Sequence, residues 1–384
     1  MNFEGSIKSK LPQAGTTIFA IMSGLANECS AINLSQGFPD FPVSEALISL
    51  VNQHMRRGAN QYAPMPGIIT LRERIAEKME KLYAVKYNPD TEITITAGGT
   101  QAIFTAVNAL IKEGDEVIIF DPAYDSYAPS VVLAGGMPIH YDLNAPDYKV
   151  DWSVIKKLIT KQTRMIIINT PHNPTGSILA AADMQMLENL VSNSNIIILS
   201  DEVYEHIIFD GMQHQSVCRY PKLAERSLVV FSFGKTYHAT GWKMGYILAP
   251  ENLMTEFRRV HQFNVFSVNT PIQMALADYM KDESTYQNLG SFYQAKRDTF
   301  RALISTSRFK IMDCAGSYFQ LLDYSAVTDE KDTEFAIRMT KEFGVAAIPV
   351  SVFYQRKVDN KLLRFCFAKD DETLNRAAEK LCAI

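Results

Sequence analysis

Blocks of apolar residues alternate with amphipathic blocks between residues 92 and 250. The apolar blocks are short and rich in Val, Ile and Leu, which is typical of strands covered on both faces of a parallel sheet. They occupy residues 92–97, 116–120, 137–143, 164–169, 195–200, 227–232 and 244–249. Segments with helical periodicity separate most of them, for example residues 100–112, 151–161 and 181–192. This alternation predicts an α/β domain with a mostly parallel sheet flanked by helices.

The pattern changes beyond about residue 285. Helical periodicity covers residues 292–306 and 332–344, and strand-like runs cover residues 317–325 and 362–369. We therefore expect two domains. The large α/β domain would span residues 41–285, and a smaller α+β domain would combine residues 1–40 with 286–384.

Composition and charge exclude several classes of protein. The chain has 384 residues, is 47% hydrophobic and carries a net charge of −4, with 38 Lys+Arg against 42 Asp+Glu. Its basic residues are scattered, so no nucleic-acid partner is expected. No apolar run approaches the ~18–20 residues that span a bilayer, and the first residues lack the apolar core of a signal peptide. We expect a cytoplasmic protein with no membrane partner.

The five cysteines are odd in number and far apart along the chain. They are Cys29, Cys218, Cys314, Cys366 and Cys382, and no two of them form a CxxC pair. The spacing therefore predicts neither a disulfide framework nor a metal site.

Candidate chemistry follows the predicted strands, where ligands bind in sheets of this kind. The first example is "GGTQ" at residues 98–101, which opens a predicted helix. Its glycines let backbone N–H groups approach an anion, and the helix dipole favours negative charge. A tight strand-to-helix turn is the alternative interpretation. The dinucleotide fingerprint GxGxxG is absent.

Two further motifs place an aromatic and an amide after strands. Tyr124 lies in "DPAYDSY" and could stack on a flat cofactor ring, or simply pack as a half-buried tyrosine. Asn173 lies in "TPHNPTG", where the following proline excludes helix. It either offers a fixed amide to a ligand or only completes a turn.

Asp201 and Tyr204 follow the strand at 195–200. A carboxylate at the end of an apolar strand needs a partner, whereas capping a helix is the structural alternative. Tyr204 could face the same cleft.

Lys235 lies in "FSFGKTYHATGWKMG", residues 231–245. A lysine in a partly dry cleft can lose its proton and form a Schiff base with a carbonyl. Most loop lysines are instead solvated charges. Combined with the residues at the other strand ends, the lysine completes a pocket suited to pyridoxal phosphate.

The order of these motifs resembles the class I/II aminotransferases of the fold-type I pyridoxal-phosphate family. The resemblance runs from about residue 30 to the end, where "RFCF" is the last motif. Three further motifs are most similar to the methionine and kynurenine/glutamine transaminase branch: "NLSQGFPDFP" (33–42), "NQYAPMPG" (60–67) and "VFSVNTP" (265–271).

The resemblance implies a role for each residue around the cofactor ring. Lys235 would carry the cofactor through a Schiff base and then move a proton as general acid and base. Asp201 would pair with the ring nitrogen, so that the ring can act as an electron sink. Asn173 and Tyr204 would hydrogen-bond the phenolic oxygen, and Tyr124 would stack on the ring.

The phosphate group has its own set of implied ligands. They are the amides of Gly99, Thr100 and Gln101, the hydroxyl of Ser232, the charge of Lys243, and Tyr62 of a neighbouring subunit. The contribution of Tyr62 implies a homodimer. Many aminotransferases carry arginine where Lys243 stands, and lysine offers a point charge instead of a planar fork.

The resemblance also implies how substrate is bound. Arg364 would hold the α-carboxylate bidentately, with Gly37 allowing close backbone approach. The side-chain pocket would be lined by Phe19, Phe38, Phe266 and Tyr62. The implied reaction is transfer of the α-amino group of an apolar or aromatic L-amino acid, methionine foremost, to a 2-oxo acid.

Three other functions are alternatives to this one. A carbon–sulfur β-lyase acting on cysteine conjugates or cystathionine would use the same site residues. A transcription regulator that senses the cofactor would need an N-terminal DNA-binding domain, yet the aminotransferase pattern already begins near residue 30. A Rossmann dehydrogenase lacks its glycine fingerprint here.

Overall fold

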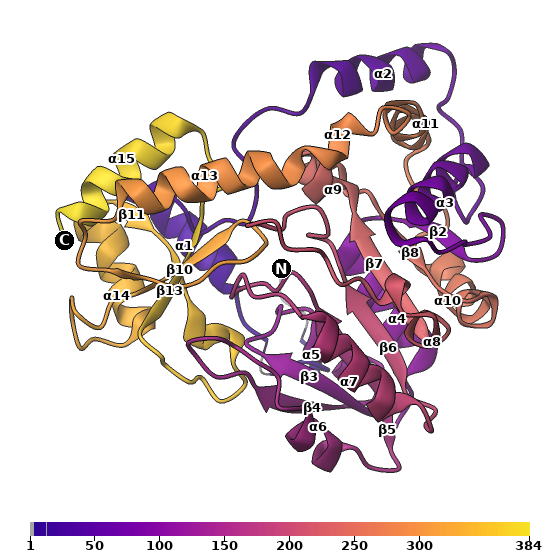
Figure 1. Ribbon diagram of the computed structural model, residues 1–384, viewed down its shortest axis with the longest axis horizontal. Coiled ribbons are helices and arrows are strands. Elements are labelled where there is room, and N and C mark those ends of the chain that lie inside the picture. The colour runs from indigo at the N-terminus through magenta and orange to yellow at the C-terminus, as the bar shows by residue number, and fades with distance from the viewer. Residues whose placement is uncertain (1–3, 13) are drawn as a thin grey trace.

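The computed structural model describes residues 4–12 and 14–384. Its main feature is a seven-stranded sheet with the strand order β2-β8-β7-β6-β5-β3-β4 (Figure 1). Strand β8 is antiparallel to its neighbours β7 and β2, and the other pairs are parallel. The strands are β2 (Ile93–Thr96), β3 (Glu116–Asp121), β4 (Met137–Asp142), β5 (Thr163–Asn169), β6 (Ile197–Asp201), β7 (Ser227–Ser232) and β8 (Gly245–Leu248). The mostly parallel sheet is thus confirmed.

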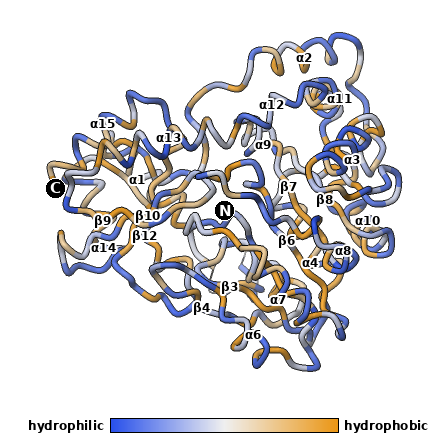
Figure 2. Tube along the Cα trace, viewed as in Figure 1, coloured by the Kyte–Doolittle hydropathy of each residue, from blue (hydrophilic) through white to orange (hydrophobic). Residues whose placement is uncertain are grey.

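Both faces of this sheet are covered, because alternate residues of a strand point to opposite sides. In β6, Ile197 and Leu199 pack in a cluster with α4 (Gly99–Leu110) and α10 (Glu251–Asn264). Ile198 packs on the other side, in a cluster that draws on α3 (Ile69–Tyr83), α6 (Trp152–Leu158), α7 (Ala181–Val191) and α11 (Thr270–Tyr279). Hydrophobic colouring accordingly follows strands of this sheet, such as β3 and β6, in Figure 2.

A second sheet has four antiparallel strands in the order β12-β13-β10-β9. These are β12 (Ile348–Pro349), β13 (Leu362–Cys366), β10 (Phe319–Asp323) and β9 (Lys310–Ile311). Helices α1 (Ile18–Glu28), α13 (Leu289–Leu303), α14 (Asp332–Arg338) and α15 (Asp371–Cys382) gather around it on the left of Figure 1.

The N-terminal segment joins this second unit. Strand β1 (Ile32–Asn33) pairs in parallel with β11 (Val345–Ala346), and α1 contacts β11 and β12. Such contacts support a domain made from both ends of the chain, while the boundaries 1–40 with 286–384 and 41–285 stay a prediction.

The remaining helices complete the two units. They are α2 (Glu45–Arg56), α5 (Tyr127–Leu133), α8 (Pro221–Ala224), α9 (Phe233–Thr236) and α12 (Ser284–Gln287), with 3-10 turns at Val217–Arg219, Thr240–Trp242 and Val350–Phe353. One expected helix differs in form. The α-helical part of 332–344 ends at Arg338, and a π-helical turn, Met339–Phe343, leads to Gly344 at φ +69°.

The chain after β6 leaves the large sheet and packs against the second unit. Tyr204, Ile207 and Phe209 belong to the same hydrophobic cluster as Tyr293 of α13 and Phe319 of β10. The carboxyl end of β6 therefore faces the second unit directly.

Within the described residues, no helix is long and apolar enough to cross a membrane. Nor does any group of three or more His, Cys, Asp or Glu side chains there have the arrangement of a metal site.

Candidate active site

A cavity of about 320 Å³ lies between the two units, where β5, β6 and β7 end. Asn169, Asp201 and Ser232, the last residues of these strands, line one wall. Arg364 of β13 and Phe319 of β10 line the opposite wall. The cavity thus lies at the carboxyl edge of the sheet, as the sequence predicted.

Lys235 lies on α9, a single helical turn that directly follows β7. Its amine donates to the carbonyl oxygen of Gly37 at 3.0 Å and to the hydroxyl of Tyr318 at 2.7 Å. Burial lowers the pKa of Lys235 to about 8, so about a tenth of the amine is neutral at pH 7, far more than for an ordinary lysine. The alternative of a solvated loop charge is therefore wrong.

Asp201 is buried at the end of β6, and a tyrosine that the sequence analysis missed holds it. Tyr127 donates its hydroxyl to Asp201 Oδ2 at 2.6 Å, while the Val203 N–H donates to Oδ1 at 3.3 Å. Burial raises the pKa of Asp201 to about 6. The helix-capping alternative is wrong, because turns and no helix follow β6. Tyr127 lies three positions after Tyr124 in the same motif, which is the only signal that pointed to it.

The start of α4 offers an anion site on the cavity wall. Its first N–H groups, at Gly99, Thr100 and Gln101, have no acceptor among the described residues. Gly98 has φ +84°, and a Cβ added there would come within 3.5 Å of the Lys243 amine. Free amides, the helix dipole and a lysine converge here, which favours a phosphate group.

Close backbone packing keeps this anion site in place. A Cβ on Gly245 would approach the Phe231 carbonyl oxygen to 2.7 Å and the backbone of Gly98 to 3.1 Å. Glycine at the start of β8 therefore lets the loop before α4 lie directly against the sheet.

Tyr124 lines the cavity beside this anion site. Its hydroxyl lies 3.1 Å from the Thr100 hydroxyl, and its ring meets Tyr127 edge-on with centroids 5.7 Å apart. An aromatic face is thereby available to a flat ligand.

Arg364 is only 1% exposed and faces the cavity from β13. It donates to Asn173 Oδ1 at 2.8 Å and to the Ser35 carbonyl oxygen at 2.9 Å. Its Nε atom is buried with no partner among the described residues. Burial lowers the pKa of Arg364 to about 10, which still leaves the group charged at neutral pH. A buried, incompletely paired guanidinium is suited to binding a carboxylate.

The residues around Arg364 fix its plane. The guanidinium carbon lies 4.0 Å from the ring centroid of Phe319 and 5.3 Å from that of Phe19. Gly37 lies against the same ring, because a Cβ there would come within 2.8 Å of Phe319.

Four predicted residues do not line the cavity with their side chains. Gln101 turns its side chain to the Ala97 N–H, so only its backbone reaches the anion site. Phe38, Phe266 and Tyr62 are exposed by 45%, 50% and 81%. The rings of Tyr62 and Phe266 pack edge-on at the surface, 5.3 Å apart.

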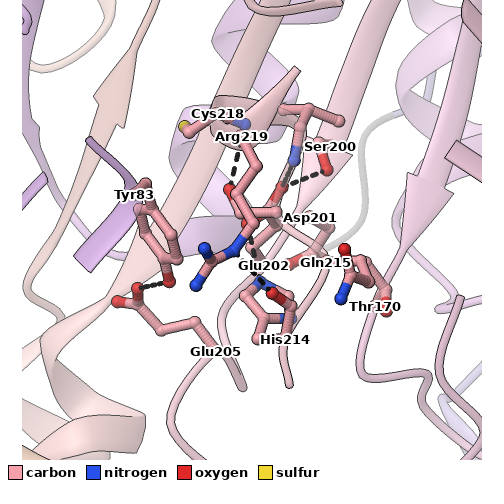
Figure 3. Close-up of polar contacts among 12 residues, drawn as sticks. Tyr83, Thr170, Ser200, Asp201, Glu202, Glu205, His214, Gln215, Cys218 and Arg219 are labelled. Carbon is pink, nitrogen blue, oxygen red and sulfur yellow. Dashed lines mark hydrogen bonds and ion pairs between the residues drawn. The ribbon is translucent and has the colours of Figure 1, made fainter. Parts of the chain in front are cut away.

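A buried polar network surrounds Glu202 and Glu205, which lie next to Asp201 and Tyr204 in the chain (Figure 3). Glu202 contacts His214 Nε2 at 2.8 Å and accepts from the Ser200 hydroxyl at 2.8 Å. Glu205 pairs with Lys78 and accepts from the Tyr83 hydroxyl at 2.7 Å. Asp201 and Tyr204 line the cavity. The two glutamates do not line it, and their hydrogen bonds and ion pair hold the same segment in place.

The comparisons with known proteins agree with this geometry. Residues 30–381 match the family "Aminotransferase class I and II". Escherichia coli methionine aminotransferase is 50% identical over 375 residues, 97% of each chain. A probable N-succinyldiaminopimelate aminotransferase of Mycobacterium tuberculosis is 35% identical, covering 98% of each chain. Human kynurenine–oxoglutarate transaminase 1 is 33% identical, covering 93% of each chain.

Solved structures share the fold throughout. An Escherichia coli protein with a methionine aminotransferase function matches with a TM-score of 0.97 and 49% identity, over 99% of this chain and 100% of that chain. Thermus thermophilus aspartate aminotransferase with maleate matches with a TM-score of 0.90 and 26% identity, over 99% of both chains. The predicted fold-type I architecture is confirmed, and the chain belongs to the aminotransferase class I and II family.

Proposed function

We propose that this aminotransferase uses pyridoxal 5′-phosphate to move the α-amino group of an apolar or aromatic L-amino acid, methionine foremost, to a 2-oxo acid. The observation that carries the proposal is the position of Lys235. Its amine, with a pKa lowered to about 8 by burial, lies in one cavity with Asp201, an anion site and the incompletely paired Arg364.

The residues present fit the proposed cofactor. Members of this family generally depend on pyridoxal phosphate. The free amides at the start of α4 and Lys243 would hold its phosphate, with Ser232 beside them. Asp201 would face the ring nitrogen, and its bond from Tyr127 stabilises the ionised carboxylate that this role needs.

The phenolic oxygen of the cofactor would meet Asn173 and Tyr204. Because Arg364 occupies the oxygen of the Asn173 side chain, the amide NH₂ is left to donate into the cavity. Burial raises the pKa of Tyr204, so its hydroxyl keeps a proton to donate.

When bound, pyridoxal phosphate supplies an electron sink that makes the α-hydrogen of the amino acid acidic. Lys235 Nζ would then take that proton from the α-carbon as a neutral amine and hold it as an ammonium, ready to donate it as a general acid. Arg364 fixes the substrate carboxylate and thereby directs the α-hydrogen towards the lysine.

Methionine is proposed as the foremost substrate because of the 50% identical Escherichia coli methionine aminotransferase. Phe19 lines the cavity next to Arg364 and offers an apolar wall to the substrate side chain. Phe38, Phe266 and Tyr62 would complete that wall only in an assembled enzyme.

A homodimer forms part of the proposal. Tyr62, Phe266 and Phe263 are exposed by 81%, 50% and 87%, which is unusual for large aromatic side chains unless a partner covers them. A second copy of the chain would bury them and would bring Tyr62 to the phosphate of the neighbouring site.

Borohydride reduction of the purified enzyme, followed by peptide mapping, tests the proposal. The cofactor should be found on Lys235, and L-methionine should change the visible spectrum while the matching oxo acid forms. A Lys235→Ala variant should lose both the label and turnover. A label on another lysine would refute the mechanism, and release of pyruvate and ammonia from cysteine conjugates without an oxo acid would indicate a β-lyase.

A further inference from the structure

Tyr318 lies directly beside the amine of Lys235, although the sequence predicts only a strand-like run there, residues 317–325. Its hydroxyl donates to the Gly37 carbonyl oxygen at 2.6 Å and accepts from Lys235 Nζ at 2.7 Å. The amine also donates to the Gly37 carbonyl at 3.0 Å. Both oxygens therefore accept from the same nitrogen.

The surroundings hold the Tyr318 hydroxyl in this arrangement. The side chain is fully buried, and its ring meets Tyr204 and Phe319 edge-on with centroids 5.1 Å and 4.9 Å away. Burial raises the pKa of Tyr318 well above its usual value, so the hydroxyl stays protonated. Because its single proton is donated to Gly37, the oxygen presents only lone pairs to Lys235.

We propose that the Tyr318 hydroxyl and the Gly37 carbonyl form a two-acceptor site for the free amine of Lys235. This site holds the nitrogen in position while Lys235 removes a proton from the bound amino acid. The inference rests on the proposed function and adds a positioning residue to it. Tyr318 acts through Lys235 and needs no contact with the substrate.

The two-acceptor site can bind both protonation states of the amine. A neutral amine has two N–H bonds and one lone pair, and two acceptors leave that lone pair facing the cavity. When the α-carbon–hydrogen bond breaks, its electron pair stays with carbon and the proton becomes the third N–H of Lys235. The resulting ammonium keeps both hydrogen bonds and directs its new proton into the cavity, where the proton is available for the general-acid step.

Several charged or titratable groups surround the amine. Arg364 and Cys366 face it from β13, Lys243 from the turn before β8, and Asp201 from β6. Within the described part of the chain, Tyr318 is the only side chain that hydrogen-bonds to the amine. Its removal takes one of the two acceptors from the amine and one donor from the Gly37 carbonyl oxygen. Tyr204, whose ring centroid lies 5.5 Å from Lys235 Nζ, also borders the Tyr318 ring.

The test compares Tyr318→Phe with Tyr293→Phe. Tyr293 is a suitable control because it is fully buried in the same aromatic cluster, 5.6 Å from the Tyr318 ring, and its hydroxyl has no partner among the described residues. In the cofactor-free protein, the pH dependence of chemical labelling at Lys235 gives the titration of its amine. In Tyr318→Phe this titration should move to lower pH, because the ammonium loses an acceptor.

The loaded enzyme gives a second readout. In Tyr318→Phe, kcat for methionine should fall about 10- to 100-fold with little change in KM, because the proton-transferring atom is misplaced and the carboxylate site is intact. The isotope effect with α-deuterated methionine should rise. Tyr293→Phe should match the unmodified enzyme in all three measurements.

If the two variants give the same titration and the same isotope effect, the positioning role of Tyr318 is refuted while the proposed function stands. If borohydride labels another lysine, the proposed function itself fails. Should Tyr318→Phe not fold, 3-fluorotyrosine at position 318 keeps the ring but makes the oxygen a weaker acceptor. It should shift the Lys235 titration in the same direction by less, and an unchanged titration would overturn the inference.

Discussion

Arg364 combines burial, charge and close contact with aromatic rings in one side chain. Its two hydrogen bonds to Asn173 and Ser35 hold the plane, while Nε lacks a partner among the described residues. Arg364→Lys keeps the charge but loses the fork, so kcat/KM for methionine should fall about 10- to 100-fold. Steady-state kinetics measure this. Arg356→Lys, whose side chain is 77% exposed, is the control and should behave like the unmodified enzyme.

The lowered pKa of Lys235 has a direct pH consequence. Burial favours the neutral amine, so its pKa of about 8 lies below that of an ordinary lysine. In the cofactor-free protein, the rate of reaction with pyridoxal phosphate should rise as pH increases to about 8 and level off above it. Stopped-flow absorbance at several pH values measures this rate. A rise that continued to pH 10 would mean that the amine is solvated.

At the scale of elements, the segment after β6 is held from both sides. Burial alone would raise the pKa of Glu205, but Lys78 of α3 holds it well below its usual range. The pair is thus ionised, and the Lys78 amine lies 3.0 Å from the Tyr246 hydroxyl. This network connects α3, β8 and the segment that carries Asp201 and Tyr204.

Breaking that buried pair should destabilise the fold. Lys78→Met leaves the Glu205 carboxylate buried without its cation, and the free energy of unfolding should fall by about 3–5 kcal/mol. Urea unfolding followed by circular dichroism measures the loss. Lys81→Met, on the exposed side of the same helix where Lys81 pairs with Glu283, is the control and should change little. Equal losses in both variants would show that the buried network contributes nothing specific.

At the scale of the whole molecule, the proposed dimer can be tested by complementation. One preparation carries Tyr62→Ala and a second carries Lys235→Ala, and each should be strongly impaired alone. In a mixed dimer one site has Lys235 from the first subunit and Tyr62 from the second, so it is intact. Unfolding and refolding the two together should restore about a quarter of the sites of the unmodified enzyme, as a random pairing of two chains requires. If the mixture is only as active as the two variant preparations added together, Tyr62 acts in the site of its own subunit or in no site.

Much of this architecture was predictable from local patterns. Most strands bury both faces, so their apolar runs match the structure to within one or two residues, for example Ile197–Asp201 against the predicted 195–200. That Lys235, Asp201 and Arg364 meet in one cavity was predictable from motif order, which carries the family resemblance, while their roles stay a prediction. The two-domain division follows from the change of pattern beyond about residue 285; its boundaries stay a prediction, which the pairing of β1 with β11 supports.

The sequence by itself determined which strands are buried, where polar groups follow them and which family the motifs resemble, because these features depend on residues close together in the chain. Only the tertiary structure decided which hydroxyls serve the two central ionisable groups. Tyr127 meets Asp201 across 74 positions and Tyr318 meets Lys235 across 83, so neither pair has a local signature. It also decided that Gln101 turns its side chain from the cavity and that Tyr62 lies at the surface. These outcomes depend on how distant segments pack, which a periodic pattern within one segment does not specify.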